Sequence, residues 1–221
     1  EWFADKPVFL RAYLDRSVIQ QVFRYPEALT SLGFLEAIGI YGHNAELNNG
    51  SQQDTDALLK TLIKMKHTVA SYNDEQLNPD EQLSKDIALY LLSLVEQFQP
   101  YRLYTYPVNQ MDGLQSAFPS FMDGQHRVHS LQDAQHYNSR LQKIENKFAQ
   151  SLAALRMREQ AGIIPPRFVI DRVLDEMNDF VNTAPQQNIL YQSLARKLAN
   201  SEVDEQHQQA VLAQAHSNIE K

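Results

Sequence analysis

The chain has 221 residues, of which 43% are hydrophobic and 21% charged, so it can bury a sizeable core and lacks the composition of a disordered protein. Its formal net charge is −7, and no stripe of lysine and arginine offsets this average, which disfavours a nucleic-acid partner. The absence of cysteine excludes disulfides, thiolate zinc sites and cysteine nucleophiles. No apolar run approaches the ~20 residues that cross a bilayer, so we expect no transmembrane segment in this chain. Because the sequence begins at Glu1 rather than at a methionine, we expect any targeting signal to lie in residues that were removed.

Helical patterns dominate the first third of the chain. The spacing of apolar residues predicts one helix around 9–23, a second over 26–38 and a third over 54–72. Ser51 and Asp54 form a capping pair ahead of the third helix. Residues 39–50, between the second and third helices, are predicted to be irregular.

The clearest start signal precedes the next helix. Asn78 can accept a hydrogen bond from a first-turn N–H, Pro79 suits the first helical position, and Glu81 completes a capping-box pattern. Apolar residues then recur every three or four positions from Leu83 to Phe98 and form one stripe of an amphipathic helix.

Residues 100–129 are predicted to form one long irregular loop, because they contain Pro107, Gly113, Pro119 and Gly124. The longest helix is predicted to start at Ser130 and to run to Gly162, about 45 Å at 1.5 Å per residue.

Three more helices follow, over 165–185, 190–198 and 202–219. The last is rich in glutamine and weakly amphipathic, so we expect a terminal helix whose packing partner is missing. Only 7 glycines occur, and no segment shows sustained period-two alternation, so no sheet is expected. The predicted fold is all-α: a single helical domain over 1–221, built as a bundle of long antiparallel helices with one long irregular loop.

Known catalytic signatures are absent from the sequence: there is no Gly-x-Ser-x-Gly elbow, no glycine-rich phosphate loop and no His-Glu-x-x-His pair. Three histidines lie close together, namely His126, His129 and His136. No carboxylate stands in a fixed register with them, so a surface or capping role is favoured over metal binding. We therefore expect no catalytic residue, no metal site and no cofactor in this chain.

Two segments remain as candidates for function. The segment 101–113 combines three tyrosines with several hydrogen-bonding side chains, a mixture that binding clefts use. The alternative is a buried turn in which Asp112 and Gly113 supply turn chemistry, and composition alone favours this alternative. The segment 161–167 is a helix stop followed by a helix start, which leaves only Arg167 for function.

These two segments carry a family resemblance. The stretch 106–113, Tyr-Pro-Val-Asn-Gln-Met-Asp-Gly, is followed some fifty residues later by 158–170, Arg-Glu-Gln-Ala-Gly-Ile-Ile-Pro-Pro-Arg-Phe-Val-Ile. In this order they resemble the bacterial domain of unknown function 885 family. The stretch 79–84 looks like the helix start of that family. The stretch 188–191 looks like its Asn-Pro-Leu-Tyr element, with Ile189 in place of proline.

The resemblance implies a function for a longer parent protein. Members of the family are typically more than twice this length and resemble gluzincin-type zinc peptidases, whose His-Glu-x-x-Pro-Gly-His-His motif is not in this sequence. It therefore implies that this chain is the N-terminal helical region of a zinc metallopeptidase, inactive alone, with zinc held in a C-terminal catalytic half that would be its partner. A periplasmic or lipid-anchored location in the cell envelope is implied in the same way.

The same resemblance suggests a wall of the substrate cleft, which would contact peptide substrate through Tyr106, Asn109, Gln110, Asp112 and Arg167. The alternative is a stand-alone helical interaction module of the cell envelope. In either case the isolated chain could form a homodimer through its terminal helix.

Overall fold

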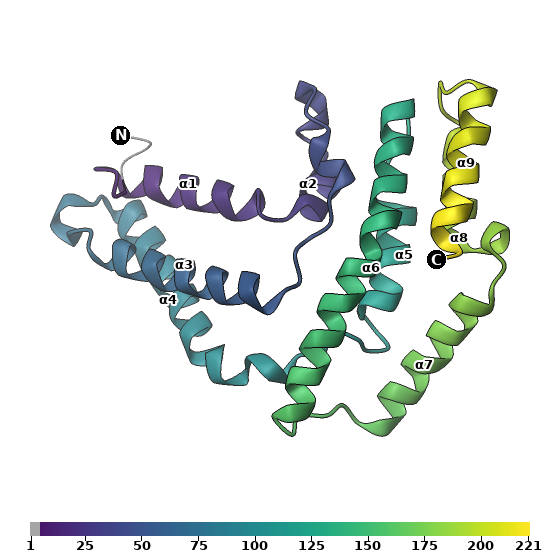
Figure 1. Ribbon diagram of the computed structural model, residues 1–221. Helices are drawn as coiled ribbons and strands as arrows, with labels where there is room; N and C mark the ends of the chain where they lie inside the picture. The colour runs from purple at the N-terminus through teal and green to yellow at the C-terminus, as the bar shows by residue number, and fades with distance from the viewer. Residues whose placement is uncertain (1–4) are drawn as a thin grey trace. The chain divides into compact units, whose positions relative to one another are not determined.

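The computed structural model describes residues 5–221, and within this range the regular elements are all helices (Figure 1). The all-α prediction is thus confirmed. The chain divides into two compact units, where one domain was expected from the sequence. Unit 1 comprises the described residues before Tyr25 together with Gly50–Thr105, and unit 2 comprises Tyr25–Asn49 and Tyr106–Lys221.

Unit 1 is built on a helical hairpin. Helices α3 (Gln52–Ala70) and α4 (Pro79–Phe98) pack side by side and are joined by a short connection that holds the 3-10 turn η3 (Asp74–Gln76). Helix α1 (Leu10–Val22) packs on α4, and the 3-10 helix η4 (Gln99–Tyr104) follows α4 directly. The core of this unit consists of Leu10, Tyr13, Val69, Tyr72 and Leu92.

The starts of the long helices form as their caps predict. Asn78 Oδ1 accepts from the backbone N–H of Glu81 at 3.0 Å, and Glu81 Oε2 accepts from the N–H of Asn78 at 3.1 Å, which completes the capping box of α4. Ser130 and Asp133 form the same reciprocal pair at the start of α6 (Leu131–Gln160). Each pair satisfies N–H groups that a helix start leaves without a partner inside the helix.

Unit 2 is organised around α6. Helix α9 (Glu205–Ile219) packs along α6, and α8 (Ile189–Ala199) packs on both α9 and α5 (Leu114–Gly124). Gly162, which follows α6, has a φ of +72°, a conformation that glycine adopts readily. Helix α7 (Arg167–Asn182) begins after this turn and diverges from α6 (Figure 1). The short helices α2 (Pro26–Leu32), η1 (Glu36–Ile38), η2 (Gly42–Ala45) and η5 (Pro185–Gln187) complete the unit.

Three expectations are corrected. The helix predicted over 26–38 is broken at Gly33, whose φ of +69° ends α2. The segment 100–129 is not one irregular loop, because it contains η4 and the eleven-residue helix α5. The terminal helix α9 does have a packing partner, since Val211 and Ala215 are buried in the same core cluster as Tyr137 of α6.

Candidate functional site

The first of the two family segments, 106–113 in unit 2, forms a compact turn. Asn109 Oδ1 accepts from the backbone N–H groups of Met111 at 2.8 Å and of Asp112 at 3.0 Å. An asparagine side chain can accept hydrogen bonds from nearby backbone N–H groups and so take the place of a backbone carbonyl in a turn. Asn109 is therefore half-buried and structural, whereas Gln110 and Asp112 point outward and are exposed.

Gly113 allows this loop to close. A Cβ at this position would lie 2.4 Å from the backbone nitrogen and 2.6 Å from the backbone oxygen of Asn109. Neither atom can move without opening the turn, so any larger residue would break it. Glycine is therefore required here by close approach, because its φ of −61° is ordinary.

Gln115 connects the loop to α7. Its Nε2 donates to the carbonyl oxygen of Asn109 at 2.6 Å and to Oε2 of Glu176 at 3.0 Å. Both partners are acceptors, which fixes the orientation of the Gln115 amide. The loop, the start of α5 and the middle of α7 are thereby held in one polar contact.

This contact lies at the wall of a groove of about 530 Å³ among α5, α6, α7 and the end of α9. Gln115 and Glu176 supply polar lining, and most of the remaining wall is apolar. A concave apolar surface with a few fixed polar groups is the usual form of a binding site for small molecules or peptide side chains. The apolar wall includes Leu114, Phe118, Ile144, Phe148, Met177 and Phe180.

The other two predicted site residues are Tyr106 and Arg167. Tyr106 is half-buried, and its hydroxyl donates to the carbonyl of Ile164 at 3.5 Å, so the two family segments do meet. Tyr106 also lies close enough to Arg158 to oppose the lowering of the Arg158 pKa that burial causes. Arg167 is exposed and pairs with Asp171 on its own helix at 3.5 Å.

A buried cluster around Arg140 of α6 is the most strongly polar interior feature of unit 2. The guanidinium is completely buried, and it donates to Thr30 Oγ1 at 2.7 Å, to the carbonyl of Glu46 at 2.9 Å and to that of His43 at 3.2 Å. It also lies over the Phe121 ring. These contacts fasten the segment 25–49 to α6.

His126 completes this cluster, which corrects the expectation of a surface or capping histidine. Its Nδ1 accepts from Arg140 at 2.7 Å, so the proton is on Nε2, which donates to the carbonyl of Asp133 at 3.1 Å. Burial, with the Arg140 charge second, lowers the pKa of His126 to about 3. Burial lowers the pKa of Arg140 to about 10, opposed by nearby glutamates of the 25–49 segment. The cluster is thus a neutral histidine against a charged arginine.

A serine and a lysine lie one turn apart on α8, a pair that some enzymes use as nucleophile and base. Burial lowers the pKa of Lys197 to about 8, and Ser193 is completely buried. The Lys197 ammonium, however, donates to the carbonyls of Met122 at 2.5 Å and His126 at 2.6 Å, at the C-terminal end of α5. The lysine is therefore a helix cap.

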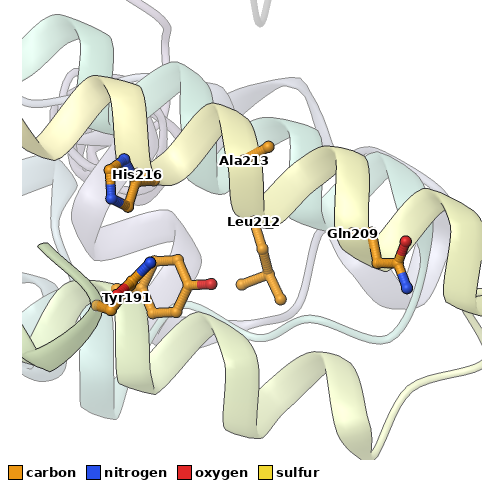
Figure 2. A pocket seen from close by; sticks show the side chains of 6 residues that line it. Tyr191, Gln209, Leu212, Ala213 and His216 are labelled. Atoms are coloured by element: carbon orange, nitrogen blue, oxygen red, sulfur yellow. The ribbon is translucent and has the colours of Figure 1, made fainter.

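A shallower pocket of about 430 Å³ opens between α8 and α9 (Figure 2). The rings of Tyr191 and His216 face each other edge to face there, with 6.4 Å between their centres. His216 also pairs with Glu220 at 3.4 Å, so its contacts are accounted for within the fold.

A zinc ion does not fit the part of the chain that the structure describes. Among residues 5–221 no three histidine or carboxylate side chains converge as metal ligands. Over the same range no helix is long and apolar enough to span a membrane.

Fold and groove together define an all-α protein with an apolar groove of about 530 Å³. The chain belongs to the bacterial proteins of unknown function named DUF885, whose family model matches residues 26–221. It is also similar to a solved structure described as "the putative lipoprotein from Colwellia psychrerythraea", with a TM-score of 0.72 and 15% sequence identity. The match covers 93% of this chain but only 39% of that chain. No curated protein matches the sequence.

Proposed function

We propose that this chain is the N-terminal helical region of a zinc-dependent peptidase of the cell envelope, and that it forms part of the substrate cleft. The observation that carries the proposal is the contact of Gln115 with both Asn109 and Glu176, which joins the family loop to the apolar groove. In this account the groove receives apolar side chains of a peptide. Zinc and the catalytic groups would come from residues outside this chain.

The loop residues play different parts in this proposal. Asn109 positions the turn, because all three hydrogen bonds of its side-chain amide are within the loop. Gln110 and Asp112 are exposed, and their side chains are free to meet a substrate. Tyr106 holds the loop against the 158–170 segment, and the exposed Arg167 begins α7 within that segment.

The proposal is tested in the longer protein that contains this region, assayed with zinc and a mixture of peptides. Met177→Glu places a charge in the groove wall, whereas Leu174→Glu changes an exposed apolar residue one turn earlier on α7. The proposal expects Met177→Glu to raise KM for apolar peptides at least tenfold while Leu174→Glu leaves it unchanged. Equal kinetics in the two variants would remove the groove from the substrate cleft. A reading frame that ends near this chain, with no zinc motif, would favour the stand-alone interaction module.

A further inference from the structure

Helix α4 of unit 1 carries apolar residues on two faces. One face buries Leu92 against α1 and α3. The other face is open, although its residues are as apolar as those of a core. Seven large side chains of α4 and η4 on this open face are 51–64% exposed, and they are Leu83, Ile87, Tyr90, Leu91, Phe98, Tyr101 and Tyr104.

The open face is large enough to serve as an interface. An aromatic side chain buries on the order of 150–250 Å², so its four aromatic residues leave roughly 370–620 Å² uncovered. The aliphatic residues bring the total close to the ~800 Å² that each partner buries in a stable complex. Monomers seldom leave so large an apolar patch bare.

The stripe on α4 is symmetric along the helix. Counted from a point midway between Tyr90 and Leu91, the apolar residues Leu83, Ile87, Leu94 and Phe98 stand at equal distances on both sides. When two such helices pack antiparallel about a two-fold axis, every residue i that meets j is matched by a j that meets i. Leu83 then faces Phe98 of the second copy, and Ile87 faces Leu94.

Charge agrees with the same arrangement. The first turn of α4 contains Asp80 and Glu81, while the exposed Arg102 follows its C-terminal end. In an antiparallel pair, Asp80 of one copy and Arg102 of the other lie at the same end of the contact, whereas the Glu81 carboxylate is engaged in the capping box. The acidic first turn and the net charge of −7 disfavour an anionic membrane surface as the occupant.

We propose that a second copy of this chain covers the open face of α4, in a two-fold antiparallel contact centred between Tyr90 and Leu91. This inference is independent of the peptidase proposal. The sequence led us to expect a dimer through the terminal helix α9, but the apolar residues of α9 are packed in the core of unit 2. The proposed dimer contact is therefore on α4 instead.

Light scattering of the purified chain at tens of micromolar tests the contact. The unchanged chain is expected to be a dimer, and Leu91→Glu, which would bring two carboxylates together at the axis, is expected to be a folded monomer. Val181→Glu, at an apolar residue of α7 that is 79% exposed, is the matched control and should remain a dimer. A monomeric unchanged chain, or a dimeric Leu91→Glu variant, would overturn the proposal.

The register is tested by cross-linking, because the chain has no cysteine of its own. A disulfide needs Cα atoms about 4.4–6.8 Å apart. Leu91→Cys should therefore cross-link with itself under mild oxidation, while Leu83→Cys and Phe98→Cys should cross-link only when mixed. Leu83→Cys that cross-links as readily alone would rule out the two-fold register. Binding of the chain to vesicles as a monomer would assign the face to a membrane and would also contradict the proposal.

Discussion

Nη1 of Arg140 lies 2.7 Å from Nδ1 of His126 in the interior of unit 2, where the guanidinium is fully buried. A cation beside an imidazole keeps that imidazole neutral, and the neutral imidazole gives the cation an acceptor. The other acceptors of Arg140 are the Thr30 hydroxyl and two backbone carbonyls, so none of these hydrogen bonds goes to a carboxylate. The pair therefore acts as a structural joint between α6 and the 25–49 segment.

Replacing Arg140 should strongly destabilise unit 2. Arg140→Ala removes a buried cation and leaves Thr30 and two carbonyls short of a donor, so we expect a loss of about 3–5 kcal/mol in the free energy of unfolding. Arg167→Ala, at an exposed arginine, should change it by less than about 0.5 kcal/mol. Urea unfolding of both variants measures the difference, and similar midpoints would show that the joint is unimportant.

The same joint predicts a pH dependence. The pKa of His126 is about 3 in the folded protein, against an ordinary value of 6.5, so between these values the unfolded chain binds the extra proton. Stability should be complete above pH 6.5 and fall as the pH drops through this window, by at most about 1.4 kcal/mol per pH unit for this residue.

His126→Gln keeps an acceptor for Arg140 without a titrating ring. We expect this variant to flatten, without abolishing, the decline of the melting temperature between pH 6.5 and 4, because burial lowers the pKa of His136 as well. An unchanged pH profile would mean that His126 is not the titrating group.

The sequence predicted the helix starts well, because a cap is a local signal. Asn78 with Glu81, and Ser130 with Asp133, act within four residues of one another. Helix α5 was missed since Pro119 and its flanking glycines indicate a loop, although Leu114, Phe118, Phe121 and Met122 have helical spacing. Pro119 is tolerated inside an eleven-residue helix that is packed on α8.

The buried cluster around Arg140 could not be predicted from local sequence signals. Arg140 meets Thr30 across 110 residues of sequence, and nothing near either residue indicates the other. Arginine is also seldom fully buried, so its position on α6 predicts exposure. The sequence places Asn109 in a loop of distinctive composition, but only the structure assigns its side chain to the turn.

The loop gives a third prediction, in which two neighbouring residues behave differently. Asn109→Ala should lower the free energy of unfolding by about 1–2 kcal/mol, since it removes the acceptor for two backbone N–H groups. Asp112→Ala should leave stability unchanged, because the exposed side chain supports nothing within the loop. Thermal melts of both variants decide this, and equal losses would mean that Asp112 also braces the turn.

The packing of α9 gives a fourth prediction. Ala215 is completely buried against the core of unit 2, whereas Ala213 on the same helix is exposed at the pocket in Figure 2. Ala215→Leu should therefore cost about 1–3 kcal/mol through overpacking, and Ala213→Leu should cost almost nothing. If both leucines are tolerated alike, α9 is loosely attached, as the sequence alone predicted.

The central claim is that this region shapes a substrate cleft but holds no catalytic centre. Its most direct measurement compares the longer protein with the isolated 221-residue chain, recording bound zinc and cleavage of a peptide mixture for both. The account predicts about one zinc per molecule and chelator-sensitive cleavage in the longer protein, with neither in the isolated chain. Stoichiometric zinc or peptide cleavage in the isolated chain, or a longer protein that lacks both, would contradict it.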